Sequence, residues 1–213
     1  MRWPLKHKLL LAGVLLAVVV GGVAVASNIG YKLVFPLVHS GGLLANDFSV
    51  SIPFNTPFNV AQDIYLAAPG ATLVARLNPS TNTFTVWVPV AGSAANNFPV
   101  ATGEGYLIRI PSGTSSSITL VGSNDPSYTY NFNIAGRDFL ISIPYSTTWQ
   151  VANDLFKAVP NASQVSRLNP PTNTFTVWVP VAGTAGNNFP IVIGEAYRVR
   201  VSAAPSVAVP EHF

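Results

Sequence analysis

The sequence contains the same twelve residues, TNTFTVWVPVAG, twice, at Thr81–Gly92 and at Thr172–Gly183. At a constant offset of 91 residues the match extends over Asp47–Ile110 and Asp138–Val201, with 38 of 64 positions identical and no insertion or deletion. Self-similarity at a fixed period indicates repeated copies of one structural unit. The chain is therefore predicted to contain two modules of the same fold.

The predicted modules occupy residues 47–122 and 123–213. Alternating apolar residues at Phe48–Ile52 predict a half-buried strand. Two further β-prone segments, Leu73–Leu77 and Phe84–Val90, flank a cluster of turn-forming residues and predict a hairpin. The expected fold class is β-rich α+β, with two tandem sandwich-like modules that each carry one short helix.

The short helix of the first module is predicted to begin at Thr56-Pro57, because threonine caps helices and proline is favoured at the first helical position. In the second module, Thr147 and Gln150 have the spacing of a capping box. Helical spacing places one apolar face on each helix. In the first copy this face consists of Val60, Ala61, Ile64, Tyr65 and Ala68.

The second arm of the hairpin, Phe84–Val90, is apolar on both of its faces. Such a strand is expected at the centre of a sheet or at the interface between modules. The aromatic residues of this repeat allow two interpretations, because aromatic rings fill cores and interfaces and also serve as stacking platforms for sugar rings. The residues concerned are Trp87, Trp178, Tyr106 and Tyr197.

Charged residues make up only 9% of the chain and hydrophobic residues 49%, whereas soluble proteins have about 25% charged residues. The formal net charge is +3, but three of the basic residues, Arg2, Lys6 and Lys8, lie at the N-terminus. Without residues 1–26 the formal charge is zero. A neutral chain argues against nucleic acid as a partner and permits self-association.

Residues 1–26 have the pattern of a secretory signal peptide. A basic start is followed by the uncharged run Leu9–Ala26, and Ala24-Val25-Ala26 resembles a signal-peptidase site before Ser27. The alternative is a retained anchor, because the run approaches the length that spans a bilayer. The expected location is secreted, extracellular or at the cell surface, with membrane contact only through the leader before cleavage.

Residues 27–46 are predicted to form an N-terminal strand and a loop. Pro36 within Tyr31–Val38 excludes a central strand, because proline donates no hydrogen bond to the ladder. This segment is expected to be an assembly strand that completes the sheet of a neighbouring copy; the alternative is that it folds back into its own module. Alternation places four side chains on one face, namely Tyr31, Leu33, Phe35 and Leu37.

The duplicated charged residues are more typical of structural ion pairs and turn caps than of a catalytic or metal site. A catalytic carboxylate pair or a calcium site is the alternative, but the sequence contains no clustered acidic loop. Structural ion pairs and turn caps are expected instead, and no catalytic, metal or cofactor site is predicted. The three histidines fall in the leader, a loop and the tail. The duplicated positions are Asp47/Asp138, Asp63/Asp154, Arg76/Arg167, Glu104/Glu195 and Arg109/Arg200.

A resemblance is carried by the segments Ser51–Phe54 and Ser142–Tyr145, the short helix, and the closing segments Gly103–Tyr106 and Gly194–Tyr197. Together they resemble a β-rich module that secreted prokaryotic cell-surface proteins carry in tandem. Ala196 departs from this pattern, because the first copy has glycine there. The resemblance covers most of the chain after the leader and implies a surface location and no reaction.

These features favour a secreted structural protein over an enzyme. The expected role is the subunit of an extracellular filament or surface layer that is assembled by β-strand donation, with other copies of the chain as partners. The alternative is a monomeric cell-surface binding or adhesion module that recognises carbohydrate or protein.

Overall fold

The computed structural model describes residues 30–39, 45–90, 96–123, 129–180 and 187–208. The predicted leader and the alternative of a retained anchor both lie outside these ranges. Within them, no helix is long and apolar enough to cross a membrane.

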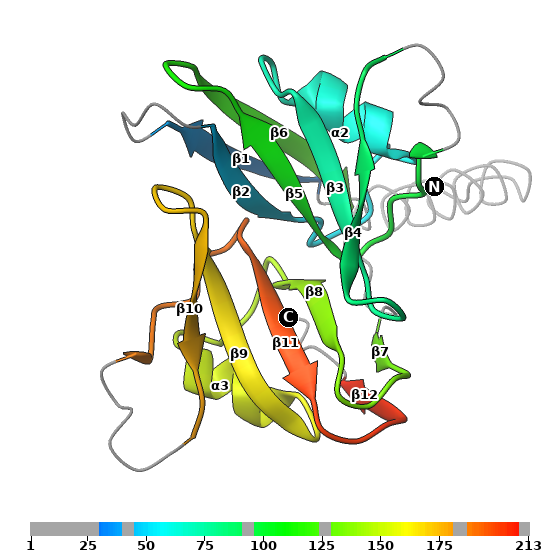
Figure 1. The fold of residues 1–213 in the computed structure, drawn as a ribbon, viewed down its shortest axis with the longest axis vertical. Coiled ribbons are helices and arrows are strands. Elements are labelled where there is room, and N and C mark those ends of the chain that lie inside the picture. The colour runs from blue at the N-terminus through cyan, green and yellow to red at the C-terminus, as the bar shows by residue number, and fades with distance from the viewer. Residues whose placement is uncertain (1–29, 40–44, 91–95, 124–128, 181–186, 209–213) are drawn as a thin grey trace, which may run out of the picture. The chain divides into compact units, whose positions relative to one another are not determined.

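Each module contains a four-stranded antiparallel sheet and one short helix (Figure 1). The strand order is β2-β5-β3-β4 in module 1 and, equivalently, β8-β11-β9-β10 in module 2. These elements are β2 (Asn46–Ser51), α2 (Ala61–Ala67), β3 (Leu73–Asn78), β4 (Thr83–Trp87), β5 (Gly105–Ile110), β8 (Asp138–Ser142), α3 (Ala152–Ala158), β9 (Ala162–Asn169), β10 (Thr174–Trp178) and β11 (Ala196–Val201). The predicted fold class is confirmed.

A two-stranded sheet completes each module. In module 1, β1 (Gly30–Val38) pairs with β6 (Ser115–Ser123); in module 2, β7 (Tyr130–Phe132) pairs with β12 (Ser206–Ala208). Pro36 therefore lies in a strand with a single neighbour, as its missing N–H predicts.

The two modules share one pairing register. Asp47 lies opposite Arg109, and 91 residues later Asp138 lies opposite Arg200. The predicted hairpin is confirmed, with Leu77 opposite Phe84 across the turn. The register recurs in both sheets, but β9 pairs with β11 over a longer stretch than β3 with β5, with a register shift between Arg200 and Val201.

The predicted helix starts are wrong. Helix α2 begins at Ala61 rather than at Pro57, because Val60 bridges to Pro99 and the Ala61 N–H donates to the Phe98 carbonyl, which keeps the preceding residues extended. The Asp63 carboxylate accepts hydrogen bonds from the main-chain N–H groups just before the helix, at 2.7 and 3.1 Å. An acidic side chain in the first turn also suits the helix dipole.

In module 2 the predicted capping pair of Thr147 and Gln150 is likewise replaced by an acidic residue inside the first turn. Asp154 accepts from the N–H groups of Gln150 and Val151 at 3.0 and 3.1 Å. The predicted apolar face of α2 is confirmed, because Ala61 and Ile64 are buried against the sheet.

Strand β4 is an edge strand, so the prediction of a central strand for Phe84–Val90 is wrong. It also ends earlier, at Trp87. The side chains of this strand alternate as predicted, but an apolar second face does not require a hydrogen-bonded strand at both edges. Here Phe84 and Val86 remain 36% and 38% exposed. In the equivalent strand β10, Phe175 is partly buried against the contact between the modules.

Candidate functional site

The modules contact each other through the sheet faces opposite their helices. Val74 of β3 is buried in the core that contains α2, whereas its neighbour Ala75 points to the other face. The buried residues of this second face form one cluster drawn from both modules, which we call the junction: Ala75, Leu77, Leu107, Leu140, Leu168 and Ala196. Burial on both faces explains why neighbouring residues such as Val74 and Ala75 are both apolar.

Two asparagines join the modules reciprocally. Asn82, in the turn after β3, accepts a hydrogen bond from the Asp138 N–H at 3.1 Å and donates one to the Asp138 carboxylate at 3.2 Å. Asn173 accepts from the Asp47 N–H at 2.8 Å and donates to the Ala45 carbonyl at 2.9 Å. Both have left-handed backbones, with φ of 61° and 51°, which asparagine tolerates well.

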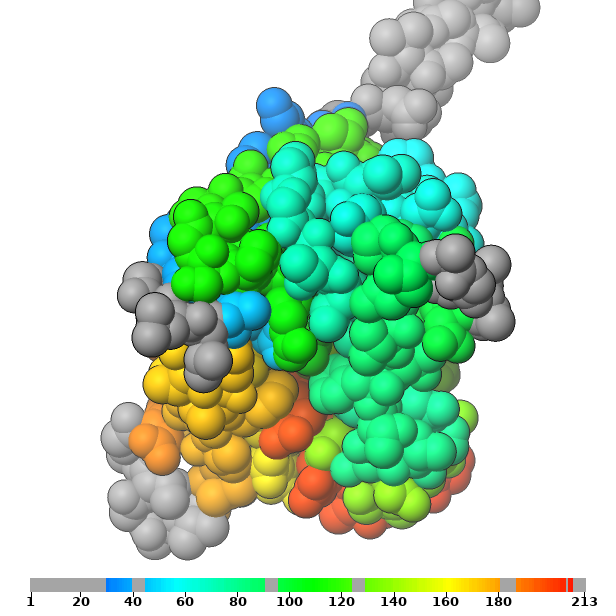
Figure 2. Space-filling model, turned by 45° about the horizontal axis from the view of Figure 1, so that its top comes forward, coloured from blue at the N-terminus to red at the C-terminus, as the bar shows by residue number. Residues whose placement is uncertain are grey.

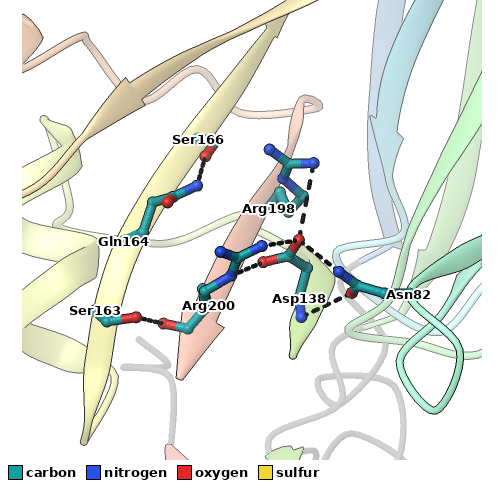
Figure 3. Close-up of polar contacts among 7 residues, drawn as sticks. All are labelled: Asn82, Asp138, Ser163, Gln164, Ser166, Arg198 and Arg200. Carbon is teal, nitrogen blue, oxygen red and sulfur yellow. Dashed lines mark hydrogen bonds and ion pairs between the residues drawn. The ribbon is translucent and has the colours of Figure 1, made fainter. Parts of the chain in front are cut away.

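The figures place this contact in the fold. Figure 3 shows Asn82 reaching Asp138 from the neighbouring module. In Figure 2 the turn near residue 80 lies against the yellow-green and red segments of module 2. Sequence analysis missed this role of the asparagines, although their identity in both copies was a usable signal.

Main-chain hydrogen bonds repeat the reciprocal pattern. The Ser51 N–H donates to the Gly194 carbonyl, and the Ser142 N–H donates to the Gly103 carbonyl, each at 2.9 Å. When residue i meets residue j and their counterparts meet in the same way, the contact is that of a twofold-related pair. The two halves of the chain therefore pack as an internal dimer.

Gly105 and Ala196, which occupy equivalent positions, meet where this reciprocal contact is tightest. A Cβ atom at Gly105 would lie 2.3 Å from the Ala196 Cβ and 2.9 Å from the Leu140 Cγ. Glycine is thus required at residue 105 for space rather than for an unusual φ. The site accommodates one methyl group but not two, which explains why Ala196 departs from the glycine of the first copy.

Gly105→Ala is expected to lower the free energy of unfolding by about 1 to 3 kcal/mol, because it overpacks the junction. Exchanging the pair, as Gly105→Ala with Ala196→Gly, returns the junction to a single methyl group. The double variant is expected within about 1 kcal/mol of the parent, given the cost of glycine in a strand. Urea unfolding of the three variants measures both effects. A neutral Gly105→Ala substitution, or a double variant less stable than the single one, would contradict this account.

The duplicated charged residues form structural ion pairs, as predicted. Arg109 holds Asp47 with bonds of 2.7 and 2.8 Å, and Arg200 holds Asp138 with bonds of 2.7 and 2.9 Å. The other two pairs are Arg76–Glu104 and Arg167–Glu195, whose closest contacts are both 2.6 Å. Among the residues with described positions, no three His, Cys, Asp or Glu side chains gather as metal ligands would.

Asp138 has the most enclosed environment of these carboxylates, with 3% of its side chain exposed. Burial alone would raise its pKa, but the hydrogen bonds from Arg200 and the nearby charge of Arg198 outweigh burial, so the pKa lies below its ordinary value. Arg198 lies 3.9 Å from the carboxylate and stacks over the Phe175 ring at 4.1 Å (Figure 3 shows the charged groups).

The four aromatic residues proposed as stacking platforms lie inside the modules. Trp87 and Trp178 are only 5% and 6% exposed and pack edge-on against Tyr65 and Phe156, each at 5.1 Å. Sugar rings have no access to these faces, so the stacking interpretation is wrong and the core interpretation is confirmed. The sequence carried a usable signal for core packing, because the helix of each module keeps an aromatic residue, Tyr65 or Phe156, that packs against the tryptophan.

The two tyrosines are fully buried, and each hydroxyl donates a hydrogen bond to the carboxylate of the glutamate two residues earlier. The distances are 2.8 Å for Tyr106 to Glu104 and 3.1 Å for Tyr197 to Glu195. Burial and, next, the negative glutamate raise the pKa of both hydroxyls. These phenols therefore stay protonated. Each buried ring connects an ion pair to the core through the hydrogen bond from its hydroxyl to the glutamate.

The predicted assembly strand lies within its own chain. Phe35 and Leu37 of β1 are buried in the core of module 1, and Leu33 and Tyr31 pack beside them, so the shared face is confirmed. Module 2 contributes to the same site. The ring of Tyr31 lies 5.0 Å from the ring of Tyr145.

Two further features of the β1 site involve module 2. A Cβ atom at Gly194 would lie 2.8 Å from the Phe35 ring, so the strand is in close contact there. A cleft of about 350 Å³ runs beside the strand and is lined by Phe35, Pro36, Val192 and Ile193, among others. The strand therefore lies in a site to which both modules contribute, with an unfilled cleft beside it.

A second cleft of about 340 Å³, with a lining that is partly polar and partly apolar, lies between the modules. It is lined by Arg76 and Thr102 of module 1 and by Tyr130 and Asn131 of module 2. Glu104 also lines it, but its carboxylate is already paired with Arg76.

The fold and these contacts define a tandem β-rich α+β protein whose two modules form an internal twofold pair. No protein-family model, no curated protein and no solved structure matches the chain.

Proposed function

We propose that this protein is a secreted structural protein, the subunit of an extracellular filament or surface layer, in which copies are joined by donation of the N-terminal strand. The observation that carries this proposal is the placement of β1. Its apolar face enters a site built by both modules, yet among the described strands it pairs with β6 alone. A strand held on one side only is easier to exchange than a central strand.

Exchange between copies would retain the contacts that β1 makes in its own chain. Burial of Phe35 and Leu37 contributes about 1.5 to 3 kcal/mol for each side chain, whichever chain supplies the strand. Swapping of an identical element is a known low-cost route to assembly. Protein concentration and the reach of the segment between β1 and β2 then decide which arrangement forms.

The charge of the chain supports the same proposal. Beyond residue 26 the formal net charge is zero, so copies have little long-range repulsion to overcome. The expected leader would deliver the protein outside the cell and release its N-terminus close to β1.

Deletion of residues 30–38 is expected to abolish filaments in negative-stain images while module 2 stays folded by circular dichroism. A synthetic peptide of residues 30–38 should bind the truncated protein and restore the folding of module 1. The matched control peptide carries Phe35→Ser and Leu37→Ser and should not bind, because its inward face is polar. Filaments of normal appearance from the truncated protein would contradict strand donation.

A second candidate is a monomeric binding module at the cell surface, and the second cleft, between the modules, is the observation that favours it. The polar part of its lining, with Arg76, Thr102 and Asn131, offers hydrogen-bond donors and acceptors to a sugar or a peptide. Glycan-array binding that Asn131→Ala abolishes would favour this candidate over the filament subunit.

A further inference from the structure

Strands β4 and β10, which we call the edge strands, each form one edge of a four-stranded sheet. The opposite edges are β2 and β8, which form bridges to the other module through Val50 and Ile141. In an antiparallel ladder, alternate residues of an edge strand direct their N–H and C=O groups away from the sheet. Within the described parts of the chain, the main chain of residues 83–87 and 174–178 bonds only to β3 and β9, respectively. Each module therefore presents an open row of main-chain donors and acceptors.

The side chains of the edge strands do not protect them. Natural edge strands are usually blocked by lysine, proline or inward-pointing charge. Thr83–Trp87 and Thr174–Trp178 contain none of these, and Phe84, Val86 and Val177 are between 36% and 38% exposed. An open edge flanked by apolar side chains favours pairing with another strand.

The two copies differ in their cores but not along these edges. The helix residue that packs against the tryptophan is Tyr65 in one copy and Phe156 in the other, and buried Ile64 is replaced by Leu155. The edge strands lie in the twelve residues that are identical, although Phe84, Val86 and Val177 are exposed. Phe175, the counterpart of Phe84, is partly buried at the junction. Contacts within one chain do not account for keeping these exposed residues the same.

We infer that the edge strands pair with the edge strands of a second copy of this chain. Antiparallel pairing centred on Thr85 of one copy and Thr176 of the other places Phe84 opposite Val177 and Val86 opposite Phe175. Aromatic and β-branched residues directly opposite each other stabilise antiparallel pairs. No like charges meet in this register, because neither strand carries a charge.

Each chain has one β4 edge and one β10 edge, so head-to-tail pairing through both links copies into an open row, or into a ring where the rotation closes, and does not stop at a dimer. This contact rests on the proposed structural role and deepens it by naming a second surface between copies. It uses strands different from β1, so the two contacts can be separated by experiment.

The first experiment blocks one edge at a time in the full chain. Val86→Lys blocks β4, and the matched substitution Val177→Lys blocks β10, while each leaves the other edge open. In sedimentation velocity the parent is expected to form species larger than dimers. Each single variant and the double variant are expected to lose edge-dependent association, because every β4–β10 contact then has one blocked strand, whereas an equimolar mixture of the two single variants is expected to stop at dimers. The control is Leu66→Lys, an exposed apolar position on α2 whose counterpart in module 2 is already Lys157. This variant should behave like the parent.

The second experiment tests the register. The chain has no native cysteine, so only the introduced cysteines can form disulfides. Chains with Thr85→Cys and chains with Thr176→Cys are mixed and oxidised. Opposed Cα atoms of an antiparallel pair are about 4.5 to 5.5 Å apart, a distance that suits a disulfide. Cross-linked dimers are expected, and chains with Gln62→Cys, on the exposed side of α2, should give none.

The outcomes separate this contact from strand donation. Edge-dependent dimers that persist after deletion of residues 30–38 support edge pairing even if donation fails. A double lysine variant that assembles like the parent, or cross-linking no greater than that of the Gln62→Cys control, overturns edge pairing and leaves strand donation standing.

Discussion

Replacing Trp178 with alanine is expected to lower the free energy of unfolding by about 3 to 5 kcal/mol, the usual cost of truncating a buried aromatic side chain to alanine. The indole is enclosed between the sheet and Phe156 of α3, so the neighbouring side chains can collapse only partly into the space it leaves. Chemical denaturation followed by tyrosine fluorescence or circular dichroism measures the change.

Trp87→Ala provides the matched control, because Trp87 has the same burial and an equivalent aromatic partner in Tyr65. The two losses should agree within about 1 kcal/mol. A loss below about 1 kcal/mol for either variant would mean that the ring is not part of a packed core.

Asp138→Asn is expected to cost about 3 kcal/mol, the scale for removing one partner of a buried ion pair. The variant leaves Arg198 and Arg200 without their shared carboxylate and weakens the bond from Asn82. Asp47→Asn is the control. Its carboxylate is more exposed and pairs with Arg109 alone, so a loss nearer 1 kcal/mol is expected.

The loss caused by Asp138→Asn should depend on pH. Because the folded pKa of Asp138 lies below its ordinary value, its contribution is complete above about pH 4 and is lost as the pH falls through the folded pKa. The difference between parent and variant should therefore be constant from pH 7 to about pH 5 and shrink at lower pH. A difference that grew on acidification would contradict the assigned ion pair.

Local patterns predicted the strands and their pairing well. The turn cluster before Phe84 located the hairpin, and the constant offset placed Asp47 and Asp138 at equivalent points of two sheets. These features depend on residues close in sequence or on comparison of the two copies. The ion pairs followed from the same comparison, because each charge recurs together with its partner.

The junction could not be predicted, because it depends on which apolar faces meet. Nothing near Asn82 in the sequence reveals that its partner is Asp138, which lies 56 residues away. The starts of the helices were mispredicted for a related reason. Thr56 and Pro57 have good local propensity, but pairing of Val60 with Pro99 decides where the helix begins.

The unequal pair at the tightest point of the junction affects how copies recognise one another. Two second modules placed together would bring two methyl groups into the space that holds one, and Arg198 would take the place of Leu107 in the apolar cluster. Two first modules would lack the methyl group and would replace Leu140 with Ser49. Unlike halves thus fit better than like halves. Each half therefore favours the unlike half over another copy of itself. The covalent link then makes the unlike half of the same chain the partner at the highest effective concentration.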